Sequence, residues 1–238
     1  MRTAHSLFVW SPSFSIWPRT LLDSFFWEPV RALPSKRKTS SFTSNWLSTW
    51  NVRSNRDGAV LIDAPVSGAV PRAKTGTLAI MIGGNDKAAI ERAKPLLLAM
   101  GKQLFETGPL GTGHAMKALN NYIAAAGYTA VAEALLIGER FGLNQETMVD
   151  ILNASTGRNF TTEVMVKEHV LGGKFATGFA VGLMAKDVKI AADLGEAVKL
   201  DAPLSRLIRE RWAIARDRLG AAGDTSAAIL SWKDNLPE

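Results

Sequence analysis

The sequence predicts an α/β segment that leads through one long helix into an all-helical segment, with a boundary near residue 111. Short apolar runs of strand length alternate with a helical stretch between residues 57 and 110. After Gly113 the apolar residues recur at helical spacing instead. The chain has 238 residues, of which 47% are hydrophobic, so it can bury a sizeable core.

The α/β part shows strand-like runs separated by turn signals. The first run, Ala-Val-Leu-Ile-Asp-Ala-Pro-Val, ends at a proline, and either Asn85 or Asp86 can cap the helix that follows the second run. In order, we expect a strand over 59–66, a loop of small residues over 67–76, a strand over 77–82, a helix from about 86 to 100 and a strand over 102–107.

The helical part begins with one long helix over residues 114–141. Its apolar and small residues fall at helical spacing, and it carries almost no charge between Tyr122 and Ala132. Gly-rich or capped turns then separate further helices, which are predicted at about 145–154, 160–171, 181–195, 203–219 and 225–235.

Residues 1–56 have a different composition and no sustained periodicity, so we expect them to be disordered or foreign to the fold. They contain eight basic and two acidic residues and five of the seven Trp, whereas residues 57–238 have no net charge. Three interpretations are open: an organelle transit peptide, a nucleic-acid contact, or sequence from a displaced frame or start site. The basic cluster Lys36-Arg37-Lys38 is too short to support nucleic-acid binding and is typical of a solvated linker.

Composition also excludes several classes of site. The chain has no Cys, which excludes disulfides, thiolate metal centres and a thiol nucleophile. Its three His show no ligand spacing, so we expect no metal. No apolar run approaches the length of a membrane span, and we expect a cytoplasmic protein without a membrane or nucleic-acid partner.

Three fragments carry candidate chemistry. Lys117 and Asn121 are four residues apart on the long helix and therefore share one face, where a partly desolvated lysine can act as a general acid or base. Ser67 and Gly68 offer a hydroxyl and approachable backbone N–H groups for a carboxylate, although an ordinary turn would look the same. Lys186-Asp187 by itself is best explained as a surface charge pair.

Together these fragments resemble the β-hydroxyacid dehydrogenase family, which includes 3-hydroxyisobutyrate dehydrogenase and tartronate semialdehyde reductase. The resemblance covers roughly residues 57–238. It implies a truncated Rossmann-like sheet remnant over 57–110 and a helical domain over 111–238, similar to the C-terminal domain of 6-phosphogluconate dehydrogenase. It is carried, in this order, by Asp63-Ala-Pro-Val-Ser67-Gly68, Gly76-Thr77-Leu78, Gly111-x-Gly113-x-x-x-Lys117-x-x-x-Asn121, Lys186-Asp187 and Asp224-x-Ser226-Ala227.

The resemblance implies an oxidoreductase that exchanges a hydride between NAD or NADP and small 3-hydroxy acids, and that forms a homo-oligomer through its helical domain. Lys117 would be the catalytic acid/base. Ser67, Gly68 and Asn121 would bind the substrate, and Lys186 would reach the cofactor. Ala69 stands where the family usually has a second Gly, which could narrow the approach to the substrate carboxylate.

One family feature is missing from this sequence. No G-x-G-x-x-G turn, which seats a dinucleotide pyrophosphate, occurs before residue 57. We therefore expect an unpaired sheet edge, poor solubility or oligomerisation, and weak or no nucleotide binding. The alternative to an enzyme is a non-catalytic remnant that acts as a helical oligomerisation or binding module.

Overall fold

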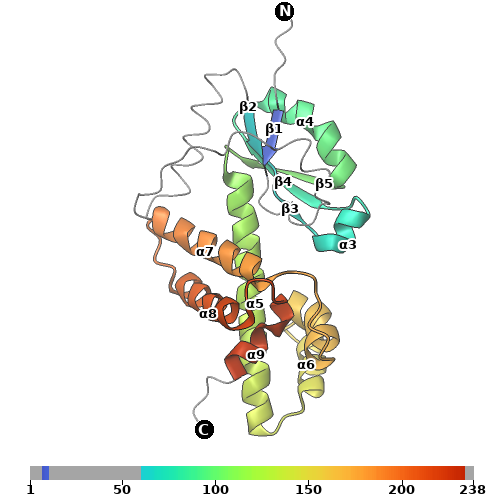
Figure 1. The fold of residues 1–238 in the computed structure, drawn as a ribbon, viewed down its shortest axis with the longest axis vertical. Helices are drawn as coiled ribbons and strands as arrows, with labels where there is room; N and C mark the ends of the chain where they lie inside the picture. Colours follow the sequence, from blue (N-terminus) through green and yellow to red (C-terminus); the bar gives the residue numbers. More distant parts are fainter. Residues whose placement is uncertain (1–6, 11–59, 234–238) are drawn as a thin grey trace, which may run out of the picture. The chain divides into compact units, whose positions relative to one another are not determined.

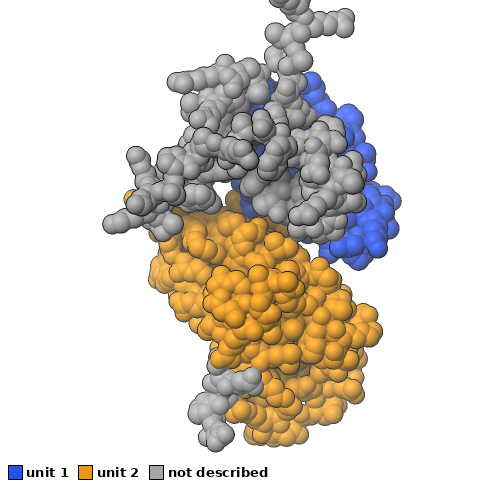
Figure 2. All heavy atoms as spheres, viewed as in Figure 1, with its two compact units in different colours: residues 1–114 blue, residues 115–238 orange. Residues whose placement is uncertain are grey.

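The computed structural model describes residues 7–10 and 60–233, and these follow the predicted order of an α/β part and an all-α part (Figure 1). The chain divides into two compact units, residues 1–114 and 115–238 (Figure 2). The sequence places its boundary at residue 111, just before the long helix α5 (Thr112–Phe141). Apart from residues 7–10, the segment 1–56 lies outside the described residues.

Strand β4 (Ala79–Gly84) is the centre of the sheet in the first unit. It pairs in parallel with β5 (Gln103–Gly108) along one edge. Along its other edge it pairs antiparallel with β2 (Val60–Asp63) and then with β3 (Val66–Ser67). The prediction of a single strand over 59–66 is therefore wrong in one respect, because the strand is interrupted at Ala64-Pro65. Proline has no N–H to donate to the hydrogen bonds of a sheet.

Two further elements of the first unit differ from the prediction. Strand β1 (Leu7–Trp10) pairs in parallel with β2, so a short strand lies in the segment where no element was expected and covers the edge of β2 that was expected to be unpaired. Helix α3 (Ala69–Lys74) replaces part of the loop expected over 67–76. Its Pro71 falls in the first turn, where the missing N–H costs no helical hydrogen bond.

Helix α4 (Lys87–Met100) packs on the sheet and closes the core of the first unit (Figure 1). The Asp86 carboxylate accepts a hydrogen bond from the backbone N–H of Ala89 at 3.0 Å, which confirms the predicted cap. The isoleucines of β2 and β4 are buried against this helix, and Leu97 on the helix is fully buried as well. The α/β part therefore has its own apolar core.

The second unit consists of helices around α5. The predicted helices over 145–154 and 203–219 coincide with the observed ones at both ends, whereas the segment predicted over 160–171 forms a π-helix and the one over 225–235 is two short helices. After α5 the elements are α6 (Gln145–Ala154), η2 (Thr161–Leu171, the π-helix), α7 (Val181–Ala197), α8 (Pro203–Leu219), η3 (Thr225–Ala227) and α9 (Ala228–Lys233).

Three aromatic side chains form the centre of the helical core. Tyr128 on α5, Trp212 on α8 and Trp232 on α9 are buried, with ring centroids 5.7 to 5.9 Å apart in tilted and edge-to-face contacts. The Trp212 ring N–H donates to Thr129 Oγ1 at 3.2 Å, and the Tyr128 hydroxyl donates to the carbonyl of Ser226 at 2.6 Å. The Trp232 ring N–H donates to the carbonyl of Arg211 at 3.4 Å, so each polar atom of these three rings has a partner.

Asp224 joins the segment before α7 to the segment before α9. Its carboxylate accepts hydrogen bonds from Thr177 Oγ1 at 2.9 Å, from the backbone N–H of Gly178 at 2.8 Å, and from the backbone N–H and hydroxyl of Ser226. An antiparallel β-bridge between Ala180 and Asp224 joins the same two segments through their backbones. We call this set of contacts the Asp224 clasp.

Replacing Asp224 with Ala removes the acceptor for all of these donors. We expect the free energy of unfolding to fall by about 2 kcal/mol, because partly buried N–H and hydroxyl groups lose a charged acceptor. Urea unfolding followed by circular dichroism measures this change. The matched control is Asp217→Ala on α8, where the carboxylate is exposed and pairs with the adjacent Arg216, and should stay within about 0.5 kcal/mol of the wild type. Equal losses in the two variants would contradict the clasp.

Candidate active site

The five site residues predicted from the sequence fall into two groups, one in each unit. Ser67 ends β3 and Gly68 precedes α3, both in the first unit. In the second unit, Lys117 and Asn121 lie on α5, and Lys186 lies on α7.

A buried carboxylate, Asp187, connects the residues of the second group. Its Oδ2 accepts a hydrogen bond from the Asn121 side-chain amide at 2.6 Å, and its Oδ1 pairs with Lys186 Nζ at 2.7 Å. Asn120 donates from its own amide to Asn121 Oδ1 at 3.1 Å. Asp187 and Asn121 are only 7% and 6% exposed. Helices α5 and α7 therefore bring an amide, a carboxylate and a lysine together in one partly buried cluster.

Lys117 lies one turn before Asn121 and is half-buried. Burial lowers the pKa of its ammonium below the ordinary value of 10.5, the nearby Asp187 carboxylate opposes this change, and Lys186 adds to it. A lysine with a lowered pKa carries more neutral amine near pH 7 than an ordinary lysine does. It can therefore accept a proton in one direction of a reaction and donate it in the other.

Asp187 is the member of this cluster that the sequence analysis missed. The pair Lys186-Asp187 was best explained from sequence as a surface pair, and for Asp187 that explanation is wrong, whereas the Lys186 side chain is 39% exposed. The signal was present, because Asp187 lies between Met184 and Val188, which the helical period places on the buried side of α7. A carboxylate within a buried stripe requires a partner inside the protein.

The backbone of the first group is unusual. Gly68 has φ 137°, and a Cβ atom there would lie 2.7 Å from Arg72 Cβ, so only glycine fits without a shift. Ala69 follows with φ 52°, in the left-handed region that favours glycine. Ala69, which stands where the family usually has Gly, thus adopts a left-handed backbone conformation that glycine adopts more easily.

Asp63 fixes the point where α5 begins. Its carboxylate accepts hydrogen bonds from the backbone N–H of Gly111 at 2.6 Å and of His114 at 2.8 Å, and lies 3.0 Å from His114 Nδ1. Burial alone would raise the pKa of Asp63, but these hydrogen bonds outweigh it and hold the pKa below its ordinary value of 3.8. Gly113 lies against the same carboxylate, where a Cβ would come within 2.8 Å of Oδ2.

These contacts test whether the described residues fit the pyrophosphate of a dinucleotide, which usually binds at a helix N-terminus after a strand. The N-terminus of α4, which follows β4, is capped by the chain's own Asp86. The N-terminus of α5, which follows β5, is filled by Asp63. Three N–H groups at these two helix ends are thus bonded to carboxylates of the chain, and a carboxylate at each end repels a phosphate, so neither end favours that part of a cofactor.

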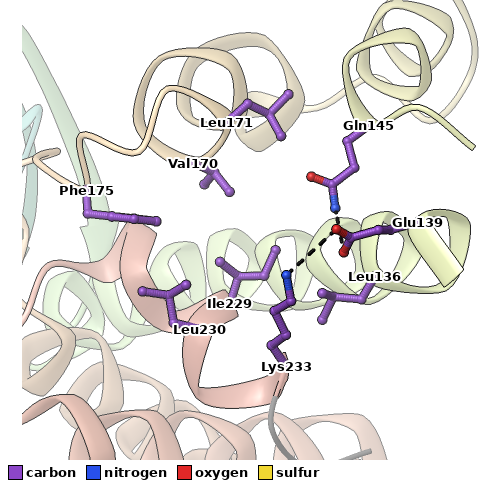
Figure 3. Close-up of a pocket in the computed structure, with 9 residues that line it drawn as sticks. All are labelled: Leu136, Glu139, Gln145, Val170, Leu171, Phe175, Ile229, Leu230 and Lys233. Atoms are coloured by element: carbon purple, nitrogen blue, oxygen red, sulfur yellow. Dashed lines mark hydrogen bonds and ion pairs between the residues drawn. The ribbon is translucent and has the colours of Figure 1, made fainter.

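A separate pocket of about 180 Å³ opens in the second unit among α5, α6, η2 and α9 (Figure 3). Leucine, isoleucine, valine and phenylalanine side chains line it, and Glu139 at its rim contacts Gln145 at 3.2 Å and Lys233 at 3.7 Å. Leu136 in its wall is 19 residues after Lys117 on α5, or roughly 30 Å along the helix axis. This pocket therefore does not include any of the predicted site residues.

The described part of the chain lacks two other kinds of site. None of its helices is both long and apolar enough to cross a lipid bilayer. No three of its His, Asp and Glu side chains gather closely enough to hold a metal ion. The Lys117 cluster and the Ser67 loop thus remain the candidates for chemistry.

Comparisons with known proteins agree with the two-part organisation. A family model for the NAD-binding domain of NADP-dependent 3-hydroxyisobutyrate dehydrogenase matches residues 111–232. A second model, for the NAD binding domain of 6-phosphogluconate dehydrogenase, matches residues 39–108. Both matched models describe NAD-binding domains, one for each part of the chain.

Individual relatives carry related names. The 2-(hydroxymethyl)glutarate dehydrogenase of Eubacterium barkeri is 34% identical over 176 residues, which is 74% of this chain and 58% of that protein. The NAD-dependent L-serine dehydrogenase of Pseudomonas aeruginosa is 36% identical over 63% of this chain and 52% of its own length. The structure of Mycobacterium tuberculosis 3-hydroxyisobutyrate dehydrogenase with L-serine matches with a TM-score of 0.70 at 30% identity, over 79% of this chain and 66% of that one. The chain spans a little over half the length of these curated relatives.

Replacing Asp63 with Ala leaves two backbone N–H groups at the start of α5 without their acceptor. We expect the free energy of unfolding at pH 7 to fall by about 3 kcal/mol. Because the folded-state pKa of Asp63 is depressed, its contribution is complete above the ordinary pKa and is lost as the pH falls through the folded-state value. Urea unfolding from pH 7 to pH 3 should show the difference between wild type and variant shrinking in acid.

The control for this prediction is Asp86→Ala, which removes a single capping bond at α4 and should cost about 1 kcal/mol. A difference between wild type and Asp63→Ala that stays constant down to pH 3 would show that the Asp63 charge does not stabilise the fold.

Proposed function

Because this chain belongs to the β-hydroxyacid dehydrogenase family, we propose that it functions in the NAD- or NADP-dependent oxidation and reduction of small 3-hydroxy acids. The observation that carries the proposal is the cluster of Asp187, Asn121 and Lys186, which lies one helical turn from the half-buried Lys117, and burial that lowers the Lys117 pKa supports it. The chain spans a little over half the length of its curated relatives, and the activity of those complete enzymes is therefore proposed for this chain rather than shown.

Lys117 is proposed as the general acid/base. In oxidation its neutral amine accepts the proton of the substrate hydroxyl, and in reduction its ammonium returns that proton. Asn121 keeps one amide proton and one carbonyl lone pair beyond its contacts with Asp187 and Asn120, and these are available to orient the substrate. When bound, the nicotinamide cofactor supplies the hydride exchange, and Lys186 is proposed to contact it.

The substrates named for the relatives share one chemical feature. Serine, 3-hydroxyisobutyrate and 2-(hydroxymethyl)glutarate each have a hydroxymethyl group on the carbon next to a carboxylate. We propose the same class for this chain, with Ser67 and Gly68 binding the carboxylate. Lys117, Lys186 and Asp187 together carry a net positive charge when Lys117 is protonated, which suits an anionic substrate.

The alternative is a non-catalytic module that acts through its helical part. The observation that favours it is a carboxylate at the N-terminus of each of α4 and α5, Asp86 and Asp63, which disfavours a pyrophosphate there. The two proposals differ in whether the chain binds a nicotinamide nucleotide. Binding of NADH or NADPH therefore separates them.

Isothermal calorimetry of the purified chain with NADH and NADPH tests the enzyme proposal. We expect one nucleotide to bind, although weakly, and a screen of 3-hydroxy acids to show turnover that Lys117→Met lowers about 10²- to 10⁴-fold. The matched control, Lys189→Met, removes a lysine from the exposed side of α7 and should leave turnover unchanged. Absence of binding for both nucleotides at millimolar concentration would support the non-catalytic module instead.

We also propose that the chain forms a homo-oligomer through α5. Exposed apolar side chains follow each other along one stripe of this helix, because their spacings of three, four, fourteen and four residues keep them on one face. Exposed apolar side chains on one face of a helix are typical of a protein interface. The stripe consists of Met116, Leu119, Ile123, Ile137 and Phe141, which are 40% to 84% exposed.

Ile137→Glu places a charge within this stripe. We expect the wild-type chain to sediment as an oligomer of its 25.7 kDa protomer and the variant to shift toward the monomer, because a buried unpaired carboxylate opposes association. The control is Ile151→Glu on α6, which is exposed but lies on another helix. A monomeric wild-type chain at all concentrations would exclude this interface.

A further inference from the structure

The acidic residues of α7 have two different environments. Asp193 pairs with Lys189 at 2.5 Å, and both side chains reach solvent, as in an ordinary helical ion pair. Asp187 instead is buried, and it contacts both its neighbour Lys186 and the Asn121 amide on another helix. A buried carboxylate is costly unless each oxygen has a partner, and here each oxygen has one.

The contact with Asp187 fixes which way the Asn121 amide points. The carboxylate oxygen can only accept, so the amide nitrogen must face it, and the amide oxygen must then face Asn120. The amide cannot rotate by half a turn without placing its oxygen against the carboxylate. The remaining amide proton and lone pair of Asn121 are thus held in one orientation.

We propose that Asp187 is the positioning residue of the Lys117 site: its carboxylate orients the Asn121 amide, anchors Lys186, and gives Lys117 a negative charge to balance the positive one. In relation to turnover, this inference rests on the proposed function. As a statement about the side chains of α5 and α7 it stands on the contacts alone.

The charges around Lys117 predict the direction in which its pKa changes when Asp187 is replaced. Within the second unit, the charged groups that act on Lys117 are both on α7: Asp187, which raises its pKa, and Lys186, which lowers it, while burial lowers it further. Without the Asp187 charge, burial and Lys186 both lower the pKa of Lys117, and no nearby negative charge opposes them. Asp187 therefore increases the share of Lys117 that is protonated, which is the form that donates a proton in reduction.

Competitive labelling measures this effect without any turnover. The full chain is acetylated with trace acetic anhydride over a range of pH values, and mass spectrometry quantifies the peptide that contains Lys117, whose reactivity follows its neutral fraction. Asp187→Asn removes the charge but keeps an oxygen that can accept from Asn121, whereas Asp187→Ala removes both. Asp193→Asn is the matched control on the same helix.

We expect the labelling midpoint of Lys117 to fall by about one pH unit in Asp187→Asn and to stay unchanged in Asp193→Asn. The orientation of Asn121 has its own readout: the amide proton that donates to Asp187 should keep its downfield NMR shift in Asp187→Asn and move toward the shift of an unbonded amide in Asp187→Ala. An unchanged midpoint in a folded Asp187→Asn variant would overturn the electrostatic part. An unchanged Asn121 signal in Asp187→Ala would overturn the positioning part.

Lys186→Met keeps the proposal testable if the Asp187 variants do not fold. The Lys186 side chain is 39% exposed, so its replacement should leave the fold intact, and removal of a like charge should raise the Lys117 midpoint. A midpoint that stays the same or falls would contradict the proposal. If the midpoints shift as expected but no 3-hydroxy acid is turned over, the positioning role stands and the proposed activity fails.

Discussion

The contact on which the rest of the structure depends is the one between Asp63 and the first turn of α5. The carboxylate at the end of β2 binds the backbone N–H groups of Gly111 and His114, so it determines the residue at which the 30-residue helix begins. In the second unit the same helix carries Lys117, Asn121 and the core residue Tyr128.

Buried or half-buried carboxylates repeat this principle elsewhere in the chain. Asp187 links α5 to α7, and Asp224 links the segment before α7 to the segment before α9. In each case one acidic side chain satisfies N–H or hydroxyl donors that helices or turns leave without partners. The apolar core supplies most of the stabilisation, whereas these carboxylates define which segments meet and at which residue.

The sequence predicts those features that depend on neighbouring residues. The ends of α6 and α8 and the cap at Asp86 follow from local spacing and capping residues, and the four-residue spacing of Lys117 and Asn121 places them on one face. The helical period of α7 indicates that Asp187 is buried, but its contact with Asn121 depends on how α7 packs against α5. The break of the first strand at Pro65 and the pairing of β1 likewise depend on partners distant in the chain.

The three carboxylate contacts also have a consequence for how the chain folds. Asp63 and His114 are 51 residues apart, Thr177 and Asp224 are 47 apart, and Asn121 and Asp187 are 66 apart. Each contact closes a long loop, which must lose its entropy before the hydrogen bonds form. The helices, whose contacts are local, can form early, whereas the cluster of Asn121, Lys186 and Asp187 is completed only when α7 docks on α5. We therefore expect the proposed site to be among the last parts of the molecule to assemble.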